Sequence, residues 1–278
     1  MAMANQIMLV QPKFRELVSY SITASTSDQV QSTQVIEPLG DIVALQFDLS
    51  VVLSGTPSGA QPITKAIKRI ALTDRNGIVI MDIAGTDLDK LEYWLMGGEY
   101  KYTTIPTAGT TTQSVSIKLN LPIKLSEQPA KIQITFAPYT DLATSGATGG
   151  TYTLKVRVWY GTAIQTLRVY KRSVSLASGD NALGYQLPDG VNTQIFGFVV
   201  SSESAINYIT FSADGTIDHY AKITLNDLAK IENQVFDTGH ITGIFNMFVA
   251  PFETDISKTR FTVNANASAT MDIYLIGS

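Results

Sequence analysis

The second half of this 278-residue chain repeats the first half, and this doubling constrains the fold more than any other feature. In the first half an apolar run, a turn and a short amphipathic segment follow one another at residues 67–72, 74–77 and 86–95. The second half has the same order at residues 206–211, 214–215 and 226–235. Ile70 and Ile209, which occupy equivalent places, are 139 residues apart. A repeat of this length predicts two copies of one structural module.

Strand patterns dominate both copies. Apolar side chains alternate with mostly polar ones from Val43 to Leu53, and the same period recurs at residues 115–121, 132–136 and 152–160. The second half offers shorter runs at residues 194–200, 206–211, 244–249, 261–263 and 271–276. A period of two places every second side chain on one buried face of a strand. The sequence therefore predicts an all-β protein built from two tandem β-sandwiches.

Two short helices are predicted, one in each copy. Residues 86–95 and 226–235 begin with the capping residues Thr86 and Asn226 and then carry apolar side chains at helical spacing. Each helix follows a hairpin, whose turn is marked by Asn76-Gly77 in the first copy and by Asp214-Gly215 in the second. The predicted module is thus a sandwich with a helix after an internal hairpin.

The chain divides into an N-terminal arm at residues 1–16, a first module at 17–161 and a second module at 162–278. The join is placed at residues 161–167 because residues 167–170 resemble the start of the first module at 17–20. Two long loops, 103–114 and 139–150, have no counterpart of equal size in the second copy. Loops of this length without secondary structure are uncommon and tend to be exposed or functional.

Composition narrows the function classes. Only 16% of residues are charged, against about 25% in an average globular protein. Such a surface is typical either of a secreted β-protein or of a protein mostly covered by its neighbours. The net charge of −4 gives no general reason to bind nucleic acid. A local basic cluster is interpreted as the solvated outer faces of two adjacent strands, and it comprises Lys155, Arg157, Arg168, Lys171 and Arg172.

Cysteine usage and hydropathy exclude further classes. The chain has no cysteine, which rules out disulfides, thiolate catalysis and cysteine-ligated zinc. Its first residues lack the basic segment and apolar run of a secretory signal, so export is not expected. No run of about 18 apolar residues predicts a membrane-spanning helix.

No residue is selected as catalytic, cofactor-binding or metal-ligating. His219 and His240 are the only histidines and fit no metalloprotease or nucleophile motif. The carboxylates between residues 74 and 92 do not have the spacing of a calcium loop, and Asp87 is interpreted as a first-turn residue favoured by the helix dipole. Trp159 is the better exposed candidate for a sugar platform, although packing in an interface is the favoured interpretation.

The hairpin-plus-helix tract at residues 70–95, its copy at 209–235 and the closing strands at 152–160 and 271–276 carry a family resemblance. The chain resembles a double jelly-roll major capsid protein of the tailless icosahedral (corticovirus/tectivirus-like) phage lineage. The resemblance implies two jelly rolls in each chain and homotrimers with a pseudo-hexameric outline that tile the shell of a virion assembled in the host cytoplasm. It also implies a structural protein, with no enzymatic activity and no cofactor.

The implied partners are copies of the chain itself, neighbouring trimers, and penton or minor capsid proteins. The apolar arm at residues 1–16 is a candidate contact with an internal lipid membrane, and no sequence-specific nucleic-acid binding is implied. Two other functions stay open at this stage. A secreted carbohydrate-binding or adhesin protein would need an export signal and an aromatic platform. A glycan-processing enzyme would need a pair of opposed carboxylates, and the spacing selects none.

Overall fold

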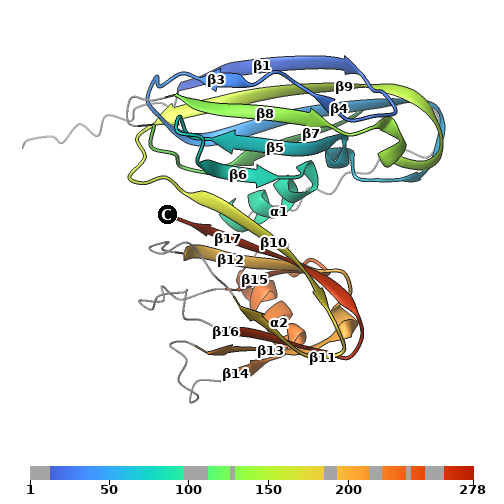
Figure 1. Cartoon of the computed structure of the whole chain (residues 1–278), viewed down its shortest axis with the longest axis vertical. Helices are drawn as coiled ribbons and strands as arrows, with labels where there is room; N and C mark the ends of the chain where they lie inside the picture. Colours follow the sequence, from blue (N-terminus) through green and yellow to red (C-terminus); the bar gives the residue numbers. More distant parts are fainter. Residues whose placement is uncertain are drawn as a thin grey trace, which may run out of the picture.

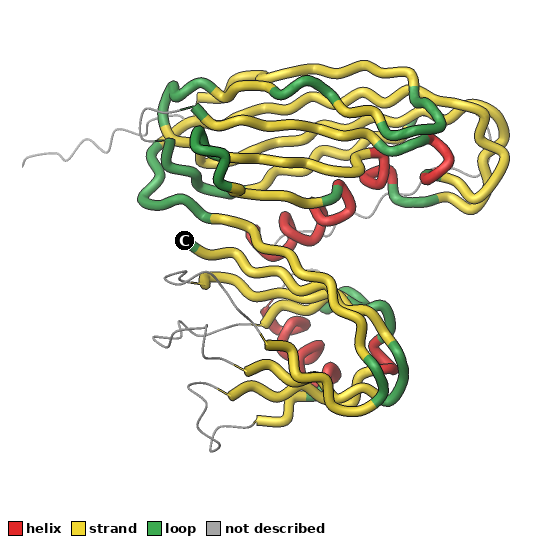
Figure 2. Tube along the Cα trace, viewed as in Figure 1, coloured by secondary structure: helices red, strands yellow, loops and turns green. Residues whose placement is uncertain are grey.

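The computed structural model describes residues 13–96, 112–125, 129–184, 193–212, 221–235, 239–247 and 260–278. Strands in these ranges build two modules that are stacked one on the other (Figure 1). The described ranges contain two α-helices, α1 (Gly85–Met96) and α2 (Leu225–Val235). Figure 2 shows α1 between the two modules, whereas α2 lies beside the strands of the second.

The first module is a two-layer sandwich. Its strands are β1 (Lys13–Thr23), β2 (Gln29–Val30), β3 (Gln34–Ile36), β4 (Asp41–Ala60), β5 (Ile67–Thr73), β6 (Val79–Ile83), β7 (Gln113–Leu119), β8 (Ala130–Phe136) and β9 (Ala143–Gly161). One layer has the order β1-β9-β4-β7, and the other has the order β6-β5-β8-β2 with β3 also on β8. Short 3-10 turns, η1 (Ile63–Ala66) and η2 (Tyr139–Asp141), precede β5 and β9.

The second module repeats this plan with shorter strands. They are β10 (Arg168–Leu176), β11 (Gly179–Gly184), β12 (Thr193–Val200), β13 (Ile206–Ser212), β14 (Ala221–Ile223), β15 (Ile244–Met247), β16 (Arg260–Ala265) and β17 (Ala269–Gly277). The layers have the orders β15-β12-β17-β10 and β11-β16-β13-β14. The turn η3 (Glu203–Ala205) precedes β13, in the place that η1 has before β5.

The strand order is identical in the two copies. When β2 and β3 are counted as one strand, each module pairs its strands as first-eighth-third-sixth in one layer and second-seventh-fourth-fifth in the other. The helix follows the fifth strand in both. This double-sheet, eight-stranded arrangement is the jelly roll, so the prediction of two tandem jelly rolls with a helix after an internal hairpin is confirmed.

One sheet continues from the first module into the second. Strand β10 pairs in parallel with β6 at Val169 and Met81. This pairing joins a layer of each module into a single nine-stranded sheet. The sequence predicted two separate sandwiches, because nothing in a local pattern reveals a pairing between strands that lie so far apart along the chain.

Strand β4 follows the predicted alternation, with a local correction at its start. The side chains of Leu45, Phe47 and Leu49 are buried as expected. The register against β9 shifts between Ile42 and Ala44, so Ile42 points into the core, Ala44 lies opposite Trp159 on the other face, and Val43 is half-buried rather than a core residue. A bulge inserts one extra residue and exchanges the two faces of the strand.

The prediction of a long loop at residues 139–150 is wrong, because most of this segment belongs to a strand. β9 begins at Ala143, and its ladder with β4 extends to the pair Ala60 and Ala143. The register of this ladder shifts on both sides of Gly55 in β4, which has a φ of +91°. Gly146 in β9, on the facing strand, has a φ of +75°. Glycine adopts such angles without steric cost, so a Gly-, Ser- and Thr-rich stretch can stay paired through bulges. In the other predicted loop, residues 103–111 lie outside the described residues.

Both helices begin slightly earlier than predicted, and their caps differ from the predicted ones. Thr224 caps α2, because its Oγ1 accepts the backbone N–H of Asp227 at 3.2 Å. At α1 the backbone N–H of Ala84 donates to Asp87 Oδ2 at 2.9 Å, which is the reciprocal half of a capping box. Thr86 and Asn226 therefore lie inside the helices.

The expected N-terminal arm is shorter than predicted. Strand β1 begins at Lys13, and residues 13–16 pair with β9 between Tyr160 and Arg157. The sequence placed this segment in the arm because the likeness of residues 167–170 to residues 17–20 set the start of the first module at Leu17. Residues 1–12, the Asp214-Gly215 turn and His219 lie outside the described residues.

Substitution of Gly146 tests the extended ladder. An added Cβ would lie 2.0 Å from the backbone oxygen of Thr56, whereas at Gly77 (φ +80°) it would meet nothing within 4 Å. Both alanine variants carry the cost of a left-handed residue, about 1–2 kcal/mol. We expect Gly146→Ala to lower the melting temperature, measured by calorimetry, clearly more than Gly77→Ala does. Equal losses would contradict the pairing of β4 with β9 at this point.

Candidate functional site: the joint between the two modules

Helix α1 is buried on nearly all sides because it lies between the two modules. Leu88, Leu91, Tyr93 and Trp94 each expose no more than 4% of their surface. The equivalent helix α2 has a solvent face, and Ile231, which corresponds to Leu91, is 44% exposed. The repeat therefore uses the same helix in two ways, and in the first copy the helix forms the joint.

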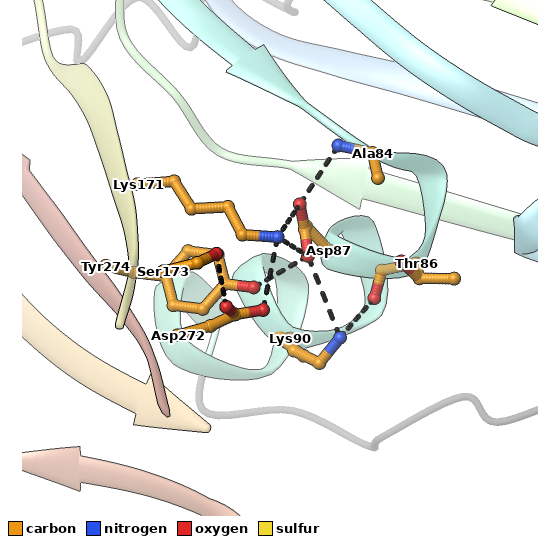
Figure 3. Close-up of polar contacts among 8 residues, drawn as sticks. All are labelled: Ala84, Thr86, Asp87, Lys90, Lys171, Ser173, Asp272 and Tyr274. Carbon is orange, nitrogen blue, oxygen red and sulfur yellow. Dashed lines mark hydrogen bonds and ion pairs between the residues drawn. The ribbon is translucent and has the colours of Figure 1, made fainter. Parts of the chain in front are cut away.

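Asp87 is the centre of a polar cluster at this joint (Figure 3). Its side chain is only 1% exposed. From the second module, Tyr274 on β17 donates its hydroxyl to Oδ1 at 2.6 Å, and Lys171 on β10 lies 3.0 Å from both carboxylate oxygens. A buried carboxylate of one module is thus neutralised by an ammonium of the other and accepts hydrogen bonds from a hydroxyl of the other and from the backbone N–H of Ala84.

Two further charges complete the cluster. Lys171 Nζ also lies 3.3 Å from Asp272 on β17, which accepts a hydrogen bond from Ser173 Oγ at 2.5 Å. Lys90 on α1 lies 3.8 Å from Asp87 and donates to the backbone oxygen of Thr86 at 2.5 Å. Two cations and two carboxylates balance one another, as buried or partly buried charges require. Burial lowers the pKa of Lys90, and the attraction of Asp87 opposes this effect.

Apolar packing interlocks the modules beside the charged cluster. The ring centroid of Trp94 lies 5.0 Å from that of Tyr274. An added Cβ on Gly197 of β12 would lie 2.6 Å from the Trp94 ring, so only a glycine lets the ring rest against that strand. The linker between β9 and β10 comprises residues 162–167. The core of the first module also includes Leu167 of this linker and Val169 of β10.

Hydrogen bonds also fix the linker to the first module. The two carboxylate oxygens of Asp41 accept the backbone N–H groups of Leu125 at 3.1 Å and Ala163 at 3.0 Å. Arg168 donates to the backbone oxygen of Val79 at 2.8 Å, alongside the β6–β10 pairing. With its backbone held in this way, the linker contributes to the joint.

The predicted basic cluster does not exist as one surface. Lys155 and Arg157 lie on β9, in the layer that contains β1, β4 and β7, whereas the other members lie on β10 in the nine-stranded sheet. The two strands follow one another in the sequence but belong to different layers, which periodicity cannot reveal. Lys171 then takes part in the joint, and Arg157 forms an ion pair with Asp48 at 2.6 Å.

The carboxylates between residues 74 and 92 are also dispersed. Asp82 pairs with Arg69 on the surface at 2.6 Å, and Glu92 accepts the backbone N–H of Lys118 on β7 at 2.8 Å. Among the described residues no group of histidine, aspartate and glutamate side chains could hold a metal ion. In the same part of the chain no helix is long and apolar enough to cross a membrane.

His240 and Trp159 are both held by neighbouring side chains. His240 lies 2.6 Å from Glu232 on α2 and 3.0 Å from Glu203 on η3, which ties that helix to the start of β13. Trp159 is half-buried on the outer face of β9, where its ring contacts Phe14 at a centroid distance of 5.1 Å and Lys118 at 4.0 Å. The joint itself was missed by the sequence analysis, which treated Asp87 as a simple first-turn residue.

Solved structures of viral capsid proteins align with the chain over almost its whole length. The major capsid protein of Sulfolobus turreted icosahedral virus has a TM-score of 0.66 and 13% identity, covering 94% of this chain and 96% of that one. Major capsid protein P2 of bacteriophage PM2 has a TM-score of 0.54 and 12% identity, covering 94% and 97%. The capsid of virus PBCV-1 gives 0.60 and 9%, covering 95% and 93%. The chain has the fold of double jelly-roll major capsid proteins. No protein-family model matches the sequence, and no curated protein matches it.

Removal of the Asp87 carboxylate tests whether the joint stabilises the double jelly roll. Asp87→Ala leaves the Tyr274 hydroxyl without its acceptor and Lys171 with the more exposed Asp272, and loss of one partner of a buried pair costs about 3–5 kcal/mol. We expect this loss in the free energy of unfolding measured with urea. The matched control Asp82→Ala breaks only the exposed pair with Arg69 and should cost no more than about 1 kcal/mol. Similar small losses in both variants would contradict a structural role of the cluster.

The pH dependence of stability gives a second test of the joint. Because burial lowers the pKa of Lys90 from its ordinary 10.5, the unfolded chain keeps this proton over an interval in which the folded protein has lost it. The free energy of unfolding contributed by this group therefore rises with pH across that interval. Relative to Lys90→Gln, the unsubstituted protein should gain stability as the pH rises toward 10.5.

Lys68 supplies a control of opposite sign. Its hydrogen bond to Asp28 raises the pKa of the ammonium, so the stability that it contributes is fully present below pH 10.5 and is lost above it, as the pH rises through the raised pKa. Relative to Lys68→Gln, the unsubstituted protein should lose stability as the pH rises. Urea unfolding at a series of pH values measures both differences, and a common direction would contradict the assigned burial of Lys90.

Proposed function

We propose that the protein is a structural major capsid protein that forms pseudo-hexameric homotrimers, and that these tile the icosahedral shell of a virion. The observation that carries the proposal is the fold match, which covers more than nine-tenths of this chain and of the viral capsid proteins alike. The match includes both jelly rolls, and therefore also their relative orientation, which depends on the joint.

The doubled fold supplies the shape that a trimer of this kind needs. Three chains around a threefold axis contribute six similar modules, and closed symmetry repeats one interface. A six-sided outline then depends on the angle between the two modules of each chain. The buried Asp87 cluster and the sheet that continues across the joint support a constant angle.

The outer face of the β1-β9-β4-β7 layer has the character of a surface that is covered by a neighbour. Its side chains form a polar ladder, in which Ser50 bonds Ser114 at 2.8 Å and Ser116 donates to Asp48 at 2.6 Å, and Arg157 balances the charge of Asp48. Phe14, which is 59% exposed, and the half-buried Trp159 add an aromatic patch. Aromatic residues and arginine are enriched in protein interfaces.

The alternative functions find less support. The Trp159 ring already contacts Phe14 and Lys118, which leaves less of its face for a sugar. Within the described residues the carboxylates of residues 74–92 are engaged in turns, surface pairs and the joint rather than opposed across a cleft. The solved structures that match are capsid components, which agrees with a structural role rather than an enzymatic one.

The remaining expectations extend the same proposal. The modules correspond to residues 17–161 and 162–278, with β1 starting slightly earlier at Lys13. In the virion, assembled in the host cytoplasm, neighbouring trimers and penton or minor capsid proteins are the expected partners. The N-terminal arm at residues 1–16, whose last four residues belong to β1, is the expected contact with an internal membrane.

Light scattering coupled to gel filtration tests the oligomer. The chain mass is 30.1 kDa, and we expect a stable species of about 90 kDa. Asp87→Ala should yield less trimer because the angle between the modules is no longer fixed, whereas Asp82→Ala should behave like the unsubstituted protein. A monomer that is retained on immobilised glycans would overturn the proposal and favour the carbohydrate-binding alternative.

A further inference from the structure

A cationic pocket lies beside the joint and is separate from the Asp87 cluster. It is a cavity of about 170 Å³ between the β5–β6 turn, the segment that follows β7 and the linker. Its lining comprises polar and charged side chains together with a few apolar ones, and the polar and charged members are Asp74, Arg75, Asn76, Lys124, Thr166 and Arg168. One water occupies about 30 Å³ in the liquid, so the cavity has room for a polyatomic ligand.

The pocket carries excess positive charge in a protein whose net charge is −4. Among the described residues that line it, three are cations and one is a carboxylate, that of Asp74. This carboxylate is already engaged, because its Oδ1 accepts the backbone N–H groups of Asn76 and Ile78, each at 2.9 Å. Its Oδ2 lies 3.7 Å from Arg168. Asp74 therefore neutralises only part of the charge.

Two of the cations have no carboxylate partner among the described residues. Arg75 contacts only the side-chain oxygen of Asn76, at 3.4 Å. The ammonium of Lys124 has no hydrogen bond or ion pair within the described part of the chain. Both side chains are exposed and line the pocket, so their charges carry no great desolvation cost. Such groups are available to a ligand.

The backbone around the pocket is fixed, so the cations are held near one another. The backbone N–H of Lys124 donates to Thr166 Oγ1 at 3.0 Å, and that of Leu167 donates to the oxygen of Pro122 at 2.9 Å. On the other wall the N–H of Gly77 donates to the oxygen of Asp74 at 3.1 Å. A site whose walls are already ordered loses less entropy when a ligand binds.

We propose that this pocket binds an oxyanion of the phosphate class. Guanidinium and ammonium groups that converge on one cavity match the several acceptor oxygens of a phosphate, and charge-assisted hydrogen bonds of this kind are short and strong. The inference depends on the pocket alone and does not rest on the capsid role.

The phosphate can come from solution or from a lipid headgroup. Two apolar side chains next to the pocket are unusually exposed, Ile164 at 92% and Ile78 at 54%. Exposed apolar side chains beside cations are typical of surfaces that lie in a membrane interface. The experiment therefore needs an arm for each source.

The first arm is calorimetric titration of the full-length protein with inorganic phosphate and sulfate at low ionic strength. The variants Lys124→Gln and Arg75→Gln should each weaken binding by about tenfold or more, because a charged hydrogen-bond donor is lost. Lys155→Gln makes the same change at an exposed site on the outer face of β9 and should leave binding unchanged. The melting temperature of each variant without added anion should match that of the unsubstituted protein.

The second arm is flotation with vesicles of phosphatidylglycerol, using vesicles of phosphatidylcholine as the neutral control. Binding of free phosphate that is weakened in Lys124→Gln supports the proposal with a soluble ligand. Flotation with the anionic vesicles alone, weakened in the same variant, supports it with a lipid headgroup. If the protein bound neither free phosphate nor anionic vesicles, the proposal would be overturned. Equal binding by Lys124→Gln and Lys155→Gln would overturn it as well. The trimer measurement is unaffected by any of these outcomes.

Discussion

The burial of the Asp87 carboxylate is the constraint on which the arrangement of the two modules depends. A carboxylate that is removed from water needs compensating partners, and here the Tyr274 hydroxyl and the Lys171 ammonium come from the other module. If the modules were rotated away from one another, the charge would lose these partners. The cluster therefore favours one relative orientation, and the packing of Trp94 against Gly197 excludes nearby ones by steric contact.

Two copies of the same module do not have to remain equivalent. In the second copy α2 is an ordinary surface helix, with Ile231 and Lys230 exposed, whereas in the first copy α1 is enclosed. The sequence explains this difference. At equivalent positions, 140 residues apart, the first copy has Tyr93 and Trp94 and the second copy has Asn233 and Gln234. Large aromatic residues on what would otherwise be a solvent face are a signal of a covered surface.

Most of the fold could be predicted from the sequence, and the site could not. The period of two in β4 and β9, the hairpin glycine Gly77 and the repeat itself are local signals, and each yielded the correct element. The joint depends on Lys171 and Tyr274 meeting Asp87 from strands that are far away in the sequence. No periodicity encodes such a meeting. The segment before Tyr152 was read as a loop because its glycines favour turns, although they also permit bulges within a ladder.

The sheet and the ion cluster restrain different motions of the joint, which explains why the structure has both. The parallel pairing of Val169 with Met81 resists separation and sliding along the strands, but a sheet can still twist between neighbouring strands. The charged cluster links α1 to β10 and β17 beyond the single pairing of Val169 with Met81, and so opposes the twist. A building block whose two halves tile a closed lattice requires control of both motions, because an error in the angle between the halves would be repeated at every copy. In the proposed capsid role, the energetic weight of the joint would therefore serve assembly as much as folding.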